Sequence, residues 1–154
     1  MHKLYPFLFW ALSFSLGAQN QRFYVSTSAT GAGNGASWAD AFPNLHPALG
    51  MAQAGDTIWV AQGVYAPAVS AARDSSFMLP SGVQLFGGFA GFESSLSQRD
   101  WVAHPTVLSG DIGIVGDSTD NAYTILYLEN PDSGTVVDGL TFRRGIANFT
   151  PLNV

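Results

Sequence analysis

The sequence predicts an all-β fold, a parallel β-helix in which short strands recur along the chain and stack as successive coils. One frame carries most of this prediction: two apolar positions separated by one residue, then a glycine three residues later. The frame occurs four times, ending at Gly63, Gly88, Gly110 and Gly145. The segments between these glycines differ in length, which a stack of coils tolerates because insertions become loops. A single coil cannot bury its own apolar face, so we expect the coils to form one continuous core.

The apolar positions of the four frames define the predicted core. Their residues are Ile58 and Val60, Val83 and Leu85, Val107, and Leu140 and Phe142. On the first of these strands the alternation predicts that Thr57, Trp59 and Ala61 face outward. An antiparallel β-sandwich is the alternative fold, because its turns also recur at short intervals. The only Asn-Gly dipeptide, Asn34-Gly35, does not separate two predicted strands, which favours the β-helix.

The N-terminus has the pattern of a secretory signal peptide. His2 and Lys3 precede an apolar run over residues 4–16, and the small residues Gly17 and Ala18 follow. The run is shorter than the roughly 20 residues that a membrane span needs. We therefore expect residues 1–18 to be a signal peptide, and the mature chain to be secreted or exposed at the cell surface without a transmembrane span.

Residues 19–56 are expected to form an N-terminal strand at 22–26, a glycine-rich loop and a capping helix. Trp38, Phe42, Leu45, Leu49 and Ala52 recur at spacings of three and four, which places them on one helical face. The spacing predicts a helix over 44–54 with a proline, residue 47, in its first turn. An amphipathic helix before a series of strands would cover the first end of the core.

Residues 57–154 are expected to form the coils. Further strands are predicted over 77–79 and 123–128, with an insertion rich in Gly and Asp over 111–121. The chain ends soon after the fourth frame, so the sequence predicts a β-helix that is incomplete at its C-terminal end and continues into further coils in a longer protein.

Composition narrows the function classes. The formal net charge of −5, without a basic cluster, disfavours nucleic acid and anionic lipid as partners. The absence of cysteine excludes disulfides, thiol catalysis and cysteine-ligated zinc.

Four motifs in order resemble the N-terminal coils of bacterial secreted right-handed β-helix proteins. This is the pectin-lyase-like superfamily, in its surface-protein branch related to polymorphic outer-membrane proteins. The motifs are Gly55-Asp56-Thr57-Ile58-Trp59-Val60-Ala61-Gln62-Gly63-Val64-Tyr65, Gly87-Gly88-Phe89-Ala90-Gly91-Phe92-Glu93, Ser97-Gln98-Arg99-Asp100-Trp101 and Leu108-Ser109-Gly110-Asp111. The resemblance covers about residues 23–148. It implies the right-handed fold, while the activity stays open because the superfamily contains lyases, hydrolases, adhesins and inert spacers.

The resemblance also directs attention to calcium-binding aspartates and to basic residues, which polysaccharide lyases of this fold use. Asp111, Asp117 and Asp120, followed by Asn121, bring oxygen donors together for a candidate Ca²⁺ site, although a solvated turn explains the same residues. Arg143 and Arg144 are candidate contacts for a uronate carboxylate of a carbohydrate, and an exposed charged strand position is the alternative.

We expect a structural role for the polar and aromatic residues that remain. In residues 98–101, Arg99 is expected to bridge backbone carbonyls or pair with Asp100 or Glu93, while Trp101 covers a coil edge. The partly outward aromatic residues Trp59, Tyr65 and Phe86 are expected to pack under loops.

The sequence as a whole thus predicts a structural or adhesive module, with polysaccharide or a cell-surface glycan as a partner and no catalytic residues. The alternative is the N-terminal part of a pectate-lyase-like polysaccharide-degrading enzyme whose active site lies in further coils.

Overall fold

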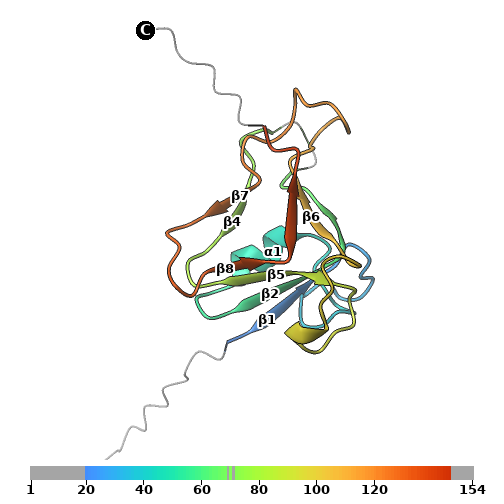
Figure 1. The fold of residues 1–154 in the computed structure, drawn as a ribbon, viewed down its shortest axis with the longest axis vertical. Coiled ribbons are helices and arrows are strands. Elements are labelled where there is room, and N and C mark those ends of the chain that lie inside the picture. Colours follow the sequence, from blue (N-terminus) through green and yellow to red (C-terminus); the bar gives the residue numbers. More distant parts are fainter. Residues whose placement is uncertain (1–19, 69, 71, 147–154) are drawn as a thin grey trace, which may run out of the picture.

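The computed structural model of the chain describes residues 20–68, 70 and 72–146. This part is mostly β-structure with parallel strands and a single α-helix (Figure 1). The predicted signal peptide, residues 1–18, lies outside the described residues.

The strands form three parallel sheets. The first sheet contains, in spatial order, β1 (Arg22–Val25), β2 (Thr57–Ala61), β5 (Gln84–Phe89) and β8 (Val136–Asp138). The second contains β3 (Gly63–Tyr65), β6 (Thr106–Ser109) and β9 (Leu140–Arg143). The third contains β4 (Phe77–Leu79) and β7 (Leu126–Leu128). All six strand pairs are parallel.

The chain visits the three sheets in a repeating order. Strands β2, β3 and β4 belong to the first, second and third sheets, and β5, β6 and β7 repeat that order. Strands β8 and β9 then begin a third pass through the first and second sheets. Figure 1 shows the three sheets on three sides of a common interior. From β2 to β6 each strand therefore pairs with the equivalent strand of the next pass and not with the strand that follows it in sequence, whereas β1 pairs with β2.

The inward side chains of the three sheets form one apolar core. Ile58 pairs in register with Leu85, and both side chains are fully buried with Val60 and Val83. From the third sheet the core includes Phe77 and Leu79, which are also fully buried. The predicted inward residues of β2 and the central stretch are thus confirmed, and the parallel pairing of β2 with β5 excludes the antiparallel sandwich for this part of the chain.

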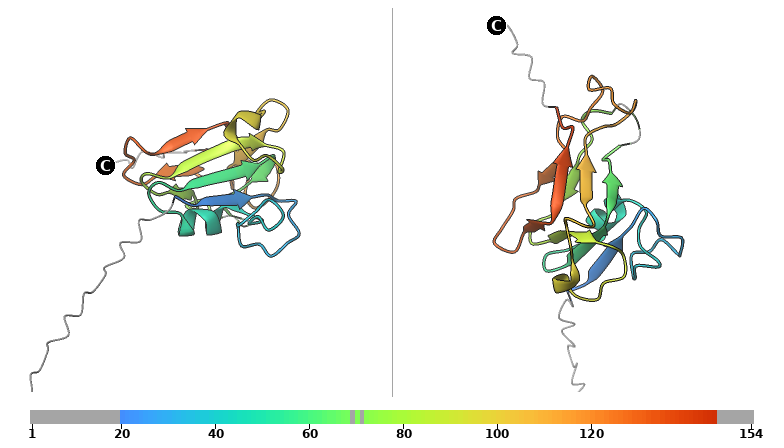
Figure 2. Two further views of the ribbon diagram at one scale, coloured as in Figure 1. Left: turned by 90° about the horizontal axis from the view of Figure 1, so that it is seen from below. Right: turned by 45° about the vertical axis from the view of Figure 1, so that its right-hand side comes forward.

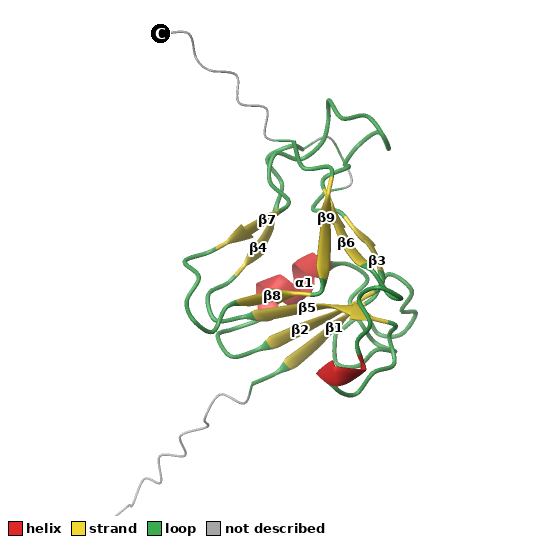
Figure 3. Ribbon diagram, in the orientation of Figure 1, coloured by secondary structure: helices red, strands yellow, loops and turns green. Residues whose placement is uncertain are grey.

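The predicted helix is present as α1 (Leu45–Met51), with Asn44 as its N-cap residue. It is shorter than the sequence indicated because Ala52 already has an extended backbone, with ψ of 140°. Its apolar face buries Leu45, Ala48 and Leu49 in the core and contacts β1, β2 and β4. Figure 2 (left) shows α1 beside β1, at the end of the stacked strands where the chain enters the fold. The remaining helical element is a single 3₁₀ turn, η1 (Leu96–Gln98; Figure 3).

Four frames at equivalent places in successive coils would put their glycines above one another, and this expectation is wrong for two of the four. Gly110 and Gly145 do lie together, since a Cβ on Gly110 would lie 3.0 Å from the Cα of Gly145. Gly88 lies inside β5 in the first sheet, whereas Gly63 begins β3 in the second sheet and pairs with Thr106. The frames that end at Gly63 and Gly88 have their apolar residues on the first sheet. Those that end at Gly110 and Gly145 have theirs on the second sheet.

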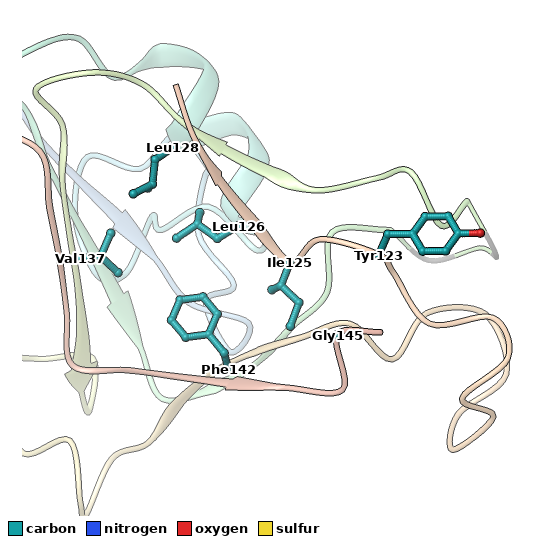
Figure 4. A pocket seen from close by; sticks show the side chains of 7 residues that line it. All are labelled: Tyr123, Ile125, Leu126, Leu128, Val137, Phe142 and Gly145. Carbon is teal, nitrogen blue, oxygen red and sulfur yellow. The ribbon is translucent and has the colours of Figure 1, made fainter. Parts of the chain in front are cut away.

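The facing of Val107 differs from the prediction, and Trp59, Ala61 and Phe142 differ in exposure. Trp59 and Ala61 leave the core on the outer side as expected, yet each is only 1% exposed because other residues cover that side. In β6 the core residue is Leu108, which pairs with Phe142, while Val107 is buried outside the main core. Phe142 points to the interior at the last pass and remains 46% exposed (Figure 4).

Two strands were not predicted. β3 begins at Gly63, the glycine that ends the first frame, and β8 precedes Gly139. Both glycines have positive φ values, 147° at Gly63 and 71° at Gly139, and each lies at the corner where the chain leaves the first sheet for the second. The chain therefore changes direction at each of these glycines, and a strand of the second sheet starts there at once.

Candidate functional site

The three aspartates of the predicted calcium site do not converge. The Asp111 carboxylate pairs with the Arg144 guanidinium and accepts a hydrogen bond from the backbone N–H of Gly116. Asp120 accepts from the backbone N–H of Ile114 at 2.7 Å. Asp117 accepts from the hydroxyl and the backbone N–H of Thr119, and these two hydrogen bonds lower the pKa of its carboxyl.

Within the described residues no three side chains of His, Cys, Asp or Glu gather in a way that could hold a metal ion. The structure therefore does not assemble the predicted Ca²⁺ site, because the three carboxylates do not meet. Asp111 pairs with Arg144 and Asp117 with Thr119, while Asp120 accepts through one oxygen and its buried Oδ1 has no hydrogen-bond partner.

The two predicted carbohydrate contacts behave differently. The Arg144 guanidinium forms an ion pair with the Asp111 carboxylate. Arg143, the last residue of β9, pairs in register with Ser109 and is exposed. Arg144 has a φ of 59°, in the left-handed region that non-glycine residues seldom adopt. Its side chain is half exposed and charge-compensated, whereas Arg143 remains a candidate surface contact.

The segment over residues 98–101 has the structural role that the sequence indicated, with a different partner. The Arg99 guanidinium donates to the carbonyl oxygens of Leu96 and Gly87, and its Nη2 lies 2.8 Å from the Asp138 carboxylate. The predicted partners Asp100 and Glu93 accept backbone N–H groups instead. Arg99 therefore fastens the loop after β5 to the end of β8.

An aromatic cluster covers the outer face of the first sheet. It consists of the buried residues Trp59, Phe86 and Phe89 and the partly buried Tyr24, Trp38 and Val136. Trp59 and Phe89 stack at 4.6 Å between ring centroids, and Tyr24 meets Trp38 edge-on at 4.8 Å. Trp59 and Phe86 are buried on the outer face, as predicted, whereas Tyr65 is buried in the main core.

The interior is open at the last pass. A pocket of about 450 Å³ lies there, and Figure 4 shows apolar side chains around it. Its lining residues are Tyr123, Ile125, Leu126, Leu128, Val137, Phe142 and Gly145. Strands β7, β8 and β9 each lie at the edge of their sheet at this end. The opposite end is covered by α1, so the two ends of the core are unlike.

A second depression, of about 660 Å³, lies between the loop after β1 and the turn after β5. We call it the outer groove. Its lining residues are Ser26, Ser28, Ala29, Thr30, Gly31, Ser37, Trp38, Ala39, Ala90, Gly91 and Phe92. Sequence reasoning missed this groove, because its two walls come from segments about 50 residues apart and no residue pattern indicates that these segments meet.

Glu93 fixes one wall of the outer groove. Its carboxylate accepts hydrogen bonds from the backbone N–H groups of Ala90, Gly91 and Phe92 at 2.6, 3.0 and 3.0 Å. Burial alone would raise the pKa of this carboxyl, but the backbone donors outweigh burial and hold the pKa below its usual value. Glu93 is therefore an ionised clamp for the turn after β5.

Within the described residues no helix combines the length and apolar character that crossing a bilayer requires. Comparison of the chain with protein-family models, with curated proteins and with solved structures found no match. The functional conclusion therefore depends on the chain's own residues and geometry.

Proposed function

We propose that this chain is a secreted or cell-surface module of a right-handed parallel β-helix, with a structural or adhesive role. The observation that supports the proposal best is the repeated order in which the chain visits its three parallel sheets. Two full passes and part of a third pair in parallel with one another, as coils of a β-helix would. In such an array each coil buries its apolar face against its neighbours, and the loops between strands form the working surface.

The residues that carry the family resemblance support the same proposal, because they perform structural tasks. The buried Asp56 carboxylate accepts the backbone N–H groups of Gln21 and Gln53, at 2.7 and 2.8 Å. Glu93 clamps the turn after β5, and Arg99 ties that loop to β8. Because these motif residues hold the backbone in place, we expect the loops between the strands to supply ligand binding.

The alternative, the N-terminal part of a polysaccharide lyase, draws on the Asp111–Arg144 pair. Lyase chemistry needs a cation beside the substrate carboxylate and a base near the proton to be removed. In this pair the carboxylate and the guanidinium compensate each other, so neither is available to a substrate without breaking the pair. We therefore favour binding over catalysis for this chain.

The test combines two assays on the purified chain without residues 1–18. We expect it to be retarded in gels that contain polysaccharide, and to release no unsaturated product from polygalacturonate or alginate with calcium present. Product release that is lost in both Arg144→Ala and Asp111→Ala would establish the lyase instead. The absence of binding to every neutral and acidic polysaccharide would contradict an adhesive role towards glycans.

A further inference from the structure

The outer groove has two walls that are fastened to each other. Trp38, from the loop after β1, donates its indole Nε1–H to the backbone carbonyl of Glu93 at 2.9 Å. The same Glu93 holds the turn after β5 through its carboxylate. On the other side Asp40 accepts the backbone N–H of Ala32 and the hydroxyl of Ser37, at 2.8 and 3.1 Å. The groove is therefore built before any ligand arrives, which limits the entropy that binding would cost.

The aromatic residues of the two walls differ in how they are packed. Trp38 rests on Tyr24 and Phe89, with ring centroids 4.8 and 5.4 Å away, and is partly buried. Phe92 is 80% exposed, although the preceding aromatic of the same segment, Phe89, is fully buried. The Phe92 ring thus projects into solvent, while the Phe92 backbone N–H is fixed by its hydrogen bond to the Glu93 carboxylate. An exposed aromatic ring on a rigid turn does nothing for the core and is available to a ligand.

The polar lining of the outer groove consists of hydroxyl groups. Ser26, Ser28, Thr30 and Ser37 contribute them, and the hydroxyls of Ser26 and Ser28 lie 3.0 Å apart. Hydroxyls both donate and accept hydrogen bonds, as sugar hydroxyls do. None of the lining residues is charged. The nearby carboxylates of Asp40 and Glu93 accept hydrogen bonds from neutral donors of the protein and remain negative. An anionic ligand would therefore find no counter-charge in this groove.

We propose that the outer groove binds a neutral saccharide, whose apolar ring face stacks on Phe92 and whose hydroxyls meet those of Ser28 and Thr30. This assignment rests on the adhesive role proposed above and names its ligand class. It differs from a contact between a uronate and Arg143, which lies on β9 and does not line the groove.

The experiment measures binding of the chain to soluble neutral polysaccharides, a β-glucan and a galactomannan, and to the acidic polygalacturonate, by affinity electrophoresis. We expect binding to at least one neutral polysaccharide, weakened about tenfold or more in Phe92→Ala and several-fold in Thr30→Val. Tyr127→Ala is the matched control, because Tyr127 is an exposed aromatic, at 52%, outside the groove. Its binding should equal that of the unsubstituted chain.

Equal melting temperatures of the variants would show that folding is unaffected, as expected for a ring that is 80% exposed. Binding to neutral polysaccharide that survives Phe92→Ala would overturn the groove assignment and leave the adhesive role intact. Binding to polygalacturonate alone, sensitive to Arg143→Ala, would do the same. If the unsubstituted chain bound none of these polysaccharides, that result would instead overturn the adhesive role itself.

Discussion

The guanidinium of Arg99 and the carboxylate of Asp138 lie 2.8 Å apart and join the loop after β5 to the end of β8. The Arg99 side chain is only 10% exposed, and it also donates to the carbonyl oxygen of Gly87 and lies over the Phe86 ring. One side chain thus connects two successive strands of the first sheet and covers the aromatic cluster on its outer face.

Replacing Arg99 by alanine should lower the free energy of unfolding by about 2 kcal/mol, because it removes several charge-assisted hydrogen bonds and the packing of the arginine stem. Chemical denaturation measures this. Arg143→Ala provides the control, since that exposed residue should change stability by less than about 0.5 kcal/mol. Equal stabilities of the two variants would mean that Arg99 does not fasten the loop.

The helix α1 covers one end of the core through Leu49, which is 5% exposed. Leu49→Asp should destabilise the chain by about 4 kcal/mol, because it buries an unpaired charge. Met51 lies in the same helix and is 55% exposed, so Met51→Asp should cost less than about 1 kcal/mol. A melting temperature that Leu49→Asp leaves unchanged would show that the helix does not seal the core.

Glu93 should make stability depend on pH in the acid range. The pKa of its carboxyl is lower in the folded chain than the unfolded value of 4.5. Its stabilising contribution is therefore complete above that value and is lost as the pH falls through the folded pKa. In Glu93→Gln the melting temperature should fall at neutral pH, and the further drop between neutral pH and about pH 3 should be smaller than in the unsubstituted chain.

Glu129→Gln serves as the control for this pH dependence, because Glu129 is exposed. It should retain the acid-induced drop of the unsubstituted chain. If Glu93→Gln retained the full drop as well, the clamp on the turn after β5 would not be ionised in the way the backbone donors indicate.

Calcium should leave the melting temperature unchanged at millimolar concentration, because Asp111, Asp117 and Asp120 each serve a different partner. A ligand that binds only the folded state raises that temperature. A calcium-dependent rise that disappears in Asp120→Ala would show that the aspartates rearrange into a site.

The strands with clear alternation were predictable, and their sheet assignment was not. In β2 the period of two identified Ile58 and Val60 as inward residues, as found. In β6 the run Thr106-Val107-Leu108 is buried on both faces, so apolarity could not tell which residue enters the core. A shift of one residue exchanges the two faces of a strand, and this is the error that placed Val107 where Leu108 lies.

The outer groove is a second feature that the sequence alone could not predict. Trp59 is buried on the outer face because Trp38 arrives from a loop that contains Gly31, Gly33 and Gly35, and such a loop has no periodicity. The pairing of Trp38 with the turn at Glu93 spans 55 residues and involves a backbone carbonyl, which no residue pattern specifies. Arg99 was correctly expected to bridge carbonyls, but its partner Asp138 belongs to a strand that the sequence did not indicate.

Engineered cross-linking is the most direct test of the repeated order of parallel strands. Met78 of β4 and Tyr127 of β7 are register partners and are 51% and 52% exposed, and the chain contains no cysteine. Parallel partners lie about 4.8 Å apart, within the range that a disulfide spans. Mild oxidation of Met78→Cys/Tyr127→Cys should therefore give a quantitative intramolecular disulfide. The offset pair Met78→Cys/Glu129→Cys should remain reduced. The reverse result, or a free thiol pair in both variants, would contradict the stacked parallel arrangement.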